Sequence, residues 1–255
     1  MIDKALIRSR FGRAWSSYDS EARFQKEMAG CLITLYRGDA KGAERVLELG
    51  CGTGLLSEKL IAALPPGSLF TFNDLSPEVL PYLSERTGTG HHLLMGDAET
   101  MEWGGPYTLI ASNASIQWWR DPVSFFTKSS AHLERGRGQI LLGTFLPDNF
   151  HELSAVTGRS LSYPTREEIR EVLSQCGFTD VLMEEKRETF RFPSVTELLR
   201  HIQKTGTGGL SPEQNGIWTP ARLARLEADL RHSGGLTPDD PLPLTYSALL
   251  LSAKR

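Results

Sequence analysis

The spacing of apolar residues predicts helix at the start of the chain. Phe11, Ala14 and Tyr18 recur at intervals of three and four, as on one face of a helix, and the pattern extends over residues 2–36. Polar residues at 16–19 interrupt it and are the candidate break between two helices. We therefore expect a helical segment before the first strand.

From residue 45 onward, short apolar runs alternate with amphipathic segments. The runs predict strands at 46–49, 69–72, 91–95, 107–111 and 139–144, and the segments predict helices at 55–64, 77–86 and 122–133. Repeated strand–helix units of this length imply a parallel sheet covered by helices on both faces. The expected fold class is therefore α/β.

The regular alternation of predicted strands and helices ends after residue 144. Residues 147–162 have the pattern of a loop or a weak helix. A capping box at Thr165 predicts a helix that ends at Gly177, and a strand is expected at 178–190. A second capping box at Ser194 predicts a helix that ends near Lys204, followed by a flexible turn at Gly206, Gly208 and Gly209. The last expected elements are a helix capped by Thr219 and Pro220 that ends near His232, and a strand at 245–253.

Composition excludes several classes of protein. The 255 residues are 40% hydrophobic and 23% charged, which is typical of a globular domain rather than a disordered or fibrous chain. The net charge of −3, from 28 Lys and Arg against 31 Asp and Glu, argues against a mainly electrostatic nucleic-acid binder. No stretch approaches the ~20 apolar residues of a membrane span, and the charged N-terminus lacks signal-peptide features. We expect a cytoplasmic protein that binds neither nucleic acid nor membrane.

Metal chemistry is not expected. Cys31, Cys51 and Cys176 are far apart and match neither a disulfide framework nor a metal-binding pair. His91 and His92 are adjacent on a predicted strand, where neighbouring side chains point to opposite faces, so the two cannot readily share one metal.

The strongest chemical signal is a glycine-rich turn after the first predicted strand, with the sequence E-L-G-C-G-T-G at 48–54. Glycines let the main chain turn sharply and let a ligand approach it. The dinucleotide fingerprint would need glycine at position 55, where the chain has Leu55, and no Gly-Lys-Ser/Thr follows as in a phosphate-binding loop. The plainer alternative is a tight turn without a ligand.

Acidic residues follow the next two strands. Asp74 ends the second strand, where a carboxylate can accept both hydroxyls of a ribose or else cap the following helix. Asp97 follows the third strand, where it can accept from an adenine amino group or form an ordinary Asx-turn. Because Glu48, Asp74 and Asp97 all lie at strand ends, together they favour a nucleoside-binding site.

These motifs resemble the class I S-adenosylmethionine-dependent methyltransferases over about residues 42–185 and the last strand. The resemblance implies a seven-stranded Rossmann-like sheet in the order 3-2-1-4-5-7-6 with the last strand antiparallel. It also implies S-adenosylmethionine as the cofactor, with the glycine turn on its methionine part and Asn113 near the transferred methyl group. The cofactor-binding residues expected on this basis are Glu48, Gly50, Cys51, Gly52, Gly54, Asp74, Leu75, Asp97, Ala98, Asn113 and Ala114.

Further segments narrow the resemblance. They are F-x-R-A-x-x-x-Y-D-x-x-A-x-x-Q at 11–25, S-N-x-x-x-Q-W at 112–118, G-T-F at 143–145 followed by F-H-E-L at 150–153, F-P-S-V at 192–195 followed by Leu199 and Arg200, and L-P-L-T-Y at 242–246. Over nearly the whole chain, this combination is similar to the malonyl-[acyl-carrier protein] O-methyltransferase family of biotin synthesis. That family methylates the free carboxyl of a malonyl thioester, so the resemblance implies malonyl acyl-carrier protein as the partner.

Such an acceptor is already ionised at pH 7 and needs no general base. A cation or a phenol is expected to hold one carboxylate oxygen while the other attacks. Arg200, whose guanidinium can donate two hydrogen bonds, is the first candidate and Tyr18 the second, while Gln117 would orient the acceptor. The plainer alternatives are a solvated arginine and a core tyrosine. Trp118 and Trp119 are expected to pack as a wall.

The chain is longer than a nucleotide-binding core requires. We expect an N-terminal helical lid segment at 1–41, the methyltransferase core at 42–192, a helical insertion of the lid at 193–240 and the last core strand at 241–255. Basic residues near 8–13 and 187–204 form the candidate surface for an acidic carrier.

Two other functions stay open. One is methylation of another small carboxylic acid or of a quinone ring; a ring carbon would need a base, for which the acceptor segments offer His151 and Glu152. The other is a non-catalytic S-adenosylmethionine-binding regulatory protein.

Overall fold

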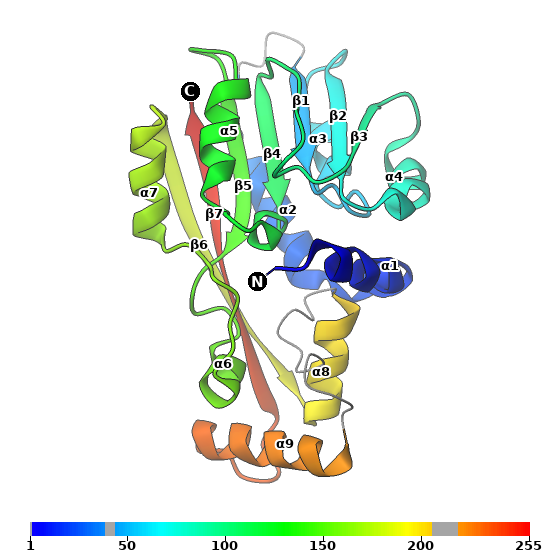
Figure 1. The fold of residues 1–255 in the computed structure, drawn as a ribbon, viewed down its shortest axis with the longest axis vertical. Helices are drawn as coiled ribbons and strands as arrows, with labels where there is room; N and C mark the ends of the chain where they lie inside the picture. Colours follow the sequence, from blue (N-terminus) through cyan, green and yellow to red (C-terminus); the bar gives the residue numbers. More distant parts are fainter. Residues whose placement is uncertain (1, 39–43, 206–218) are drawn as a thin grey trace.

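The chain forms one seven-stranded sheet in the order β3-β2-β1-β4-β5-β7-β6 (Figure 1). The structure is a computed structural model that describes residues 2–38, 44–205 and 219–255. The strands are β1 (Arg45–Leu49), β2 (Leu69–Asp74), β3 (His92–Met95), β4 (Leu109–Asn113), β5 (Gln139–Phe145), β6 (Thr179–Phe192) and β7 (Leu242–Lys254). Within this sheet β7 pairs antiparallel with both β5 and β6, and all other neighbouring strands pair parallel. The expected fold class and strand order are confirmed.

Helices cover both faces of this sheet and its carboxyl edge. They are α1 (Lys4–Glu21), α2 (Arg23–Thr34), α3 (Ser57–Ala63), α4 (Leu80–Thr87), α5 (Ser124–His132), α6 (His151–Thr157), α7 (Arg166–Gln175), α8 (Val195–Lys204) and α9 (Pro220–Gly234), with short 3-10 turns η1 (Pro77–Val79) and η2 (Ile116–Trp118). Within the described ranges, none of them is long and apolar enough to cross a membrane.

Two buried clusters lie on opposite faces of the sheet. Successive strand residues alternate between them, so Val46 belongs to one cluster and Leu47 to the other. The first cluster packs under α2 through Met28, and the second packs under α5 through Phe125. This double cover leaves the carboxyl ends of the strands as the accessible edge of the sheet.

The antiparallel pair of strands β6 and β7 projects beyond the rest of the sheet. β5 pairs with β7 only between Ala248 and Lys254, whereas β6 pairs with β7 along nearly its whole length. The projecting half carries α6, α8 and α9 (Figure 1). This added layer brings α8 against α1.

Some local expectations need correction. The break between the first two helices falls at Ala22, whose N–H donates to the Tyr18 carbonyl, and not at 16–19. Residues 151–157, for which a loop or a weak helix was expected, form helix α6, and β4 begins at Leu109 instead of residue 107. The capping box at Thr165 is confirmed, and Ser194 accepts from the N–H three residues on. The expected turn at Gly206, Gly208 and Gly209 lies outside the described residues.

Candidate active site

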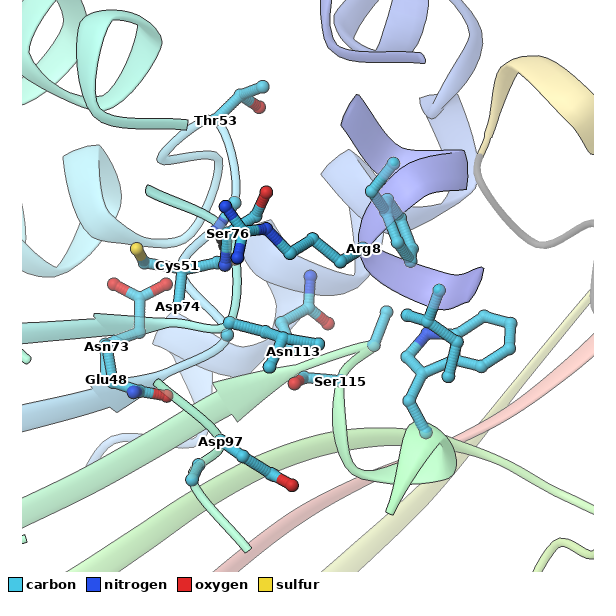
Figure 2. Close-up of a pocket in the computed structure, with 18 of the residues that line it drawn as sticks. Arg8, Glu48, Cys51, Thr53, Asn73, Asp74, Ser76, Asp97, Asn113 and Ser115 are labelled. Atoms are coloured by element: carbon cyan, nitrogen blue, oxygen red, sulfur yellow. Dashed lines mark hydrogen bonds between the residues drawn. The ribbon is translucent and has the colours of Figure 1, made fainter. Parts of the chain in front are cut away.

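A pocket lies at the carboxyl edge of the sheet, beneath α1. The glycine turn after β1 and the residues that follow β2, β3 and β4 form its floor, and one face of α1 forms its roof. Figure 2 shows Glu48, Asp74, Asp97 and Asn113 around this space, with Arg8 reaching toward Ser76 from α1. Counted with the open solvent at its mouth, the space measures about 870 Å³.

The glycine turn brings the main chain of β1 close to that of β4. Gly50 has φ +68, and a Cβ built on it would lie 2.1 Å from the Ser115 Oγ. Both the conformation and the close approach therefore require glycine. Gly54 does not line the pocket; a Cβ built on it would lie 3.2 Å from side-chain atoms of Leu83 and Arg86 on α4.

Asp74 joins the turns after β1 and β2. One carboxylate oxygen accepts from the Gly52 N–H at 2.9 Å and the other from the Ser76 N–H at 2.9 Å. Burial raises the pKa of Asp74 to about 6, against the opposite effect of these backbone bonds. The carboxylate retains lone pairs that suit the hydroxyls of a ribose.

Two buried acceptors in the pocket lack donors. Glu48 Oε2 and Asn113 Oδ1 are enclosed and have no hydrogen-bond partner within the described part of the chain. Burial also raises the pKa of Glu48 to about 8. Because an unpaired buried acceptor is costly, this pair fits a ligand with an ammonium group, such as the methionine end of S-adenosylmethionine.

Asp97 and Ala98 lie on the turn after β3, and Lys128 stabilises this turn through hydrogen bonds to its carbonyl groups. The Lys128 ammonium donates to the carbonyls of Ala98, Glu99 and Met101 at 2.9–3.1 Å. Asp97 accepts from the Glu99 N–H, as in an Asx-turn, and from the Lys4 ammonium at 3.0 Å. The cation at position 128 was not identified from the sequence, because no local pattern links it to this turn.

α1 is fastened over the pocket by ion pairs and hydrogen bonds at both ends. Lys4 contacts Asp97 and Arg8 contacts Glu78, so that the first turns are held to the segments after β3 and β2. At the other end, Asp19 accepts from the Thr53 hydroxyl and from Arg86. The helix therefore lies across the pocket at the carboxyl edge of the sheet and is held there at both of its ends.

Most of the expected cofactor residues meet in this pocket. It contains Glu48, Gly50, Cys51, Gly52, Asp74, Leu75, Asp97, Ala98, Asn113 and Ala114. Of the expected acceptor residues, only Tyr18 lines it. Gln117 is buried, donates to the Ala114 carbonyl at 2.7 Å and braces the turn after β4. Arg200 is exposed on α8 and does not reach the pocket.

The expected basic surface is largely neutralised. Arg8 pairs with Glu78, Arg187 with Asp148 at 2.7 Å, and Lys204 with Glu21 at 2.6 Å. His201 is buried, with Nε2 2.9 Å from the Tyr246 hydroxyl, and burial lowers its pKa. Arg200 is thus one of the few exposed cations in the late cluster that make no such contact.

The pocket also contains residues that were not expected to bind the cofactor or the acceptor. They are Lys4, Ile7, Arg8, Phe11 and Trp15 on α1, together with Ser115, Trp118 and Trp119 after β4. Phe11 and Trp118 belong to the family segments, but Trp118 and Trp119 were expected only to pack as a wall. On α1 the signal was present, because positions 4, 8, 11, 15 and 18 follow helical spacing, but this spacing does not distinguish a pocket face from a core face. Among residues 2–38, 44–205 and 219–255, no group of acidic, His or Cys side chains is placed to hold a metal ion.

Comparison with known proteins identifies the family. A methyltransferase-domain family model matches residues 46–136. The malonyl-[acyl-carrier protein] O-methyltransferase of Porphyromonas gingivalis is 33% identical over 254 residues, covering 99% of this chain and 96% of the relative. The enzyme of the same name from Chlorobium phaeovibrioides is 37% identical over 265 residues, covering 99% and 97%. The chain belongs to the malonyl-[acyl-carrier protein] O-methyltransferase family.

Solved structures agree on the fold. The YcgJ protein of Bacillus subtilis has a TM-score of 0.64 at 14% identity, covering 90% of this chain and 98% of its own. The phosphoethanolamine N-methyltransferase 2 of Haemonchus contortus, in complex with S-adenosyl-L-methionine, has a TM-score of 0.56 at 18% identity and covers 95% and 57%. This chain of the malonyl-[acyl-carrier protein] O-methyltransferase family thus has the same overall fold as these solved structures.

Proposed function

We propose that this chain transfers the methyl group of S-adenosylmethionine to the free carboxylate of a malonyl thioester, carried by acyl-carrier protein or coenzyme A, in biotin synthesis. The observation that carries the proposal is the full-length similarity to relatives of that name, at 33% and 37% identity. A pocket with unpaired acceptors at the expected strand ends supports it.

The pocket residues have distinct tasks in holding the cofactor. Glu48 and Asn113 would face the methionine ammonium, Asp74 the ribose hydroxyls, and Asp97 with Ala98 the adenine. When bound there, S-adenosylmethionine supplies a methyl group on a sulfonium cation. The fold aligns the acceptor with that methyl group and excludes water, while the acceptor carboxylate needs no base.

The placement of the candidate base disfavours a ring-carbon acceptor. His151 lies half-exposed on α6 and does not line the pocket. Both oxygens of Glu152 are engaged by Thr245, at 3.0 Å from its N–H and 2.5 Å from its hydroxyl. Neither residue is positioned to remove a proton at the site, which a quinone ring would require.

We also propose that residues 1–41 and 193–240 act as a lid on the core at 42–192 and 241–255. α1 roofs the pocket, and α8 packs against α1 from the projecting layer. The ion pairs of Lys4 and Arg8 are individually weak contacts that can open and close as ligands exchange.

Cofactor affinity is expected to rise between pH 6 and 8. Burial raises the pKa of Asp74 from 3.8 to about 6 and that of Glu48 from 4.5 to about 8. The folded apoprotein therefore binds a proton on each of these carboxyls more tightly than the unfolded chain does. The resulting stabilisation is full at low pH and is lost as pH rises from 3.8 through about 6 for Asp74 and from 4.5 through about 8 for Glu48. Because the cofactor needs both groups ionised, its binding should release protons.

Calorimetry in two buffers with different ionisation enthalpies measures that release at pH 7. Glu48→Gln should abolish most of it, whereas Glu167→Gln, at an exposed position on α7, should leave it unchanged. Equal heats in both buffers for the wild-type chain would contradict the assignment.

Arg200→Ala is expected to impair methyl transfer to the malonyl carrier while leaving S-adenosylmethionine affinity unchanged. Arg200 is exposed on α8, which packs against the roof helix α1, so we propose that it contacts the carrier protein outside the pocket and not the carboxylate. Loss of one charge-assisted contact should raise the KM for the carrier about tenfold. Steady-state kinetics measures this, and an unchanged KM would remove Arg200 from acceptor binding.

Complementation tests the proposed function in cells. The chain should restore growth without biotin to a strain deleted for the carboxyl-methylation step, and Asp74→Ala should fail at equal expression. Asp239→Ala, an exposed turn residue, is the matched control and should complement. Failure of the wild-type chain at normal expression would count against the proposal.

A further inference from the structure

We infer that Trp15, Tyr18 and Trp118 form the subsite that holds the acceptor carboxylate, using neutral N–H and O–H donors instead of a cation. The inference rests on the proposed function, because it places the acceptor of that reaction. It adds two tryptophans, one from the roof and one from the turn after β4, to the residues expected to touch the acceptor.

Two indole N–H groups at the pocket lack partners. The Nε1 atoms of Trp15 and Trp118 are buried and make no hydrogen bond within residues 2–38, 44–205 and 219–255. Both side chains line the pocket, although the two residues are only 6% and 8% exposed. Unpaired buried donors are rare and costly in a folded protein, so a ligand that accepts hydrogen bonds is the expected partner.

The three donors belong to one aromatic cluster around Phe11. The Phe11 ring centroid lies 5.5 Å from that of Trp15, 6.3 Å from Tyr18 and 5.9 Å from Trp118. Trp15 and Tyr18 are themselves 6.1 Å apart. The Tyr18 hydroxyl is protonated at neutral pH, since its ordinary pKa is 10.0 and burial raises it further, and it can donate a hydrogen bond. The cluster thus joins α1 to η2 across the pocket.

No lining cation is available for a carboxylate. Within the described part of the chain, Lys4 and Arg8 are the cations in the lining, and both are paired. Lys4 lies 3.0 Å from Asp97 and 3.1 Å from Glu99, and Arg8 lies 2.6 Å from Glu78. Arg200, the guanidinium expected there from the sequence, is outside the pocket. The acceptor carboxylate would therefore accept hydrogen bonds from the uncharged indole N–H groups of Trp15 and Trp118 and from the Tyr18 hydroxyl.

Neutral donors suit the chemistry of this transfer. An electron pair of the carboxylate oxygen forms the new O–CH₃ bond, while the S–CH₃ bond breaks and its pair stays on sulfur; no proton moves. The anion and the sulfonium cation both become neutral. Surroundings poor in charge favour this change, whereas a guanidinium would stabilise the reactant carboxylate more than the transition state.

Conservative replacements test the subsite. Trp15→Phe and Trp118→Phe keep an aromatic ring and remove the donor, and each should raise the KM for malonyl acyl-carrier protein about tenfold. Affinity for S-adenosylmethionine should stay within about twofold of the wild type by calorimetry, an outcome that a general packing defect would not give.

Tyr107→Phe is the matched control. It also removes a buried donor, which bonds to the Trp103 carbonyl at 2.6 Å outside the pocket, and should leave the acceptor KM unchanged. If Trp118→Phe does not fold, site-specific Trp118→benzothienylalanine removes only the N–H and is held to the same KM increase.

The outcomes separate two failures. Transfer by the wild-type chain with an unchanged KM in both tryptophan variants overturns the subsite alone. No transfer by the wild-type chain overturns the proposed function and the subsite with it.

Discussion

Asp74→Ala should weaken S-adenosylmethionine binding about 100-fold, or ~3 kcal/mol, because two hydrogen bonds from ribose hydroxyls to a charged acceptor are lost. Asp74 sits between the glycine turn and the turn after β2, where it already organises the N–H groups of Gly52 and Ser76. The variant therefore loses both the ribose contact and part of the geometry around it.

Calorimetry measures this loss directly, and thermal unfolding shows whether the fold is retained. Asp74→Asn should be intermediate, since the amide oxygen can still accept from one of the two N–H groups. Asp239→Ala, an exposed aspartate before β7, should bind the cofactor normally. An affinity for Asp74→Ala within twofold of the wild type would refute the ribose assignment.

Gly50→Ala should be the most damaging single-methyl addition in the glycine turn, with cofactor binding lost and stability reduced. The new Cβ would lie 2.1 Å from the Ser115 Oγ and 2.5 Å from its Cβ, so the β1 and β4 turns must move apart. The residue also has φ +68, which costs any non-glycine residue ~1 kcal/mol or more.

Gly158→Ala separates these two causes. Gly158 adopts the left-handed conformation after α6, with φ +65, and nothing lies within 4 Å of its Cβ position. This variant should lose only the backbone contribution and keep cofactor affinity. Denaturant unfolding and calorimetry on both variants give the comparison; equal effects at positions 50 and 158 would show that the contact with Ser115 does not matter.

The cofactor side of the site could be predicted because its residues stand at strand ends. The apolar runs predict where β1, β2 and β3 stop, and parallel strands place Glu48, Asp74 and Asp97 at one edge. The exact strand order came from the family resemblance, since the period of two in a strand carries no information about its neighbours.

On the proposed acceptor side, local spacing indicates which way Arg200 faces, but only tertiary contacts reveal which residues reach the pocket. Arg200 follows Leu198 and Leu199 and precedes Ile202, and because these three are buried, its own side chain faces solvent. Sequence spacing predicts this opposite face, but the family pattern alone suggested a catalytic position. Trp15 lies on the pocket face of α1, which only the position of that helix over the sheet reveals.

The open prediction for α6, a loop or a weak helix, has a similar cause. It begins after Phe150, which adopts a left-handed conformation at φ 56, and no side-chain cap precedes it. Glu152 fixes it by bonding to Thr245, 93 residues away in sequence. Such a start has no recognisable signal until the last strand is in place.

Mass spectrometry of acyl-carrier protein after incubation with this chain and S-adenosylmethionine tests the central claim most directly. The malonyl-loaded carrier should gain the mass of one methylene group, lose its free carboxylate and yield a methyl ester on hydrolysis of the thioester. Acetyl-loaded carrier, which has no free carboxylate, should remain unchanged. A malonyl-loaded carrier of unaltered mass, with a folded chain that binds the cofactor, would contradict the account.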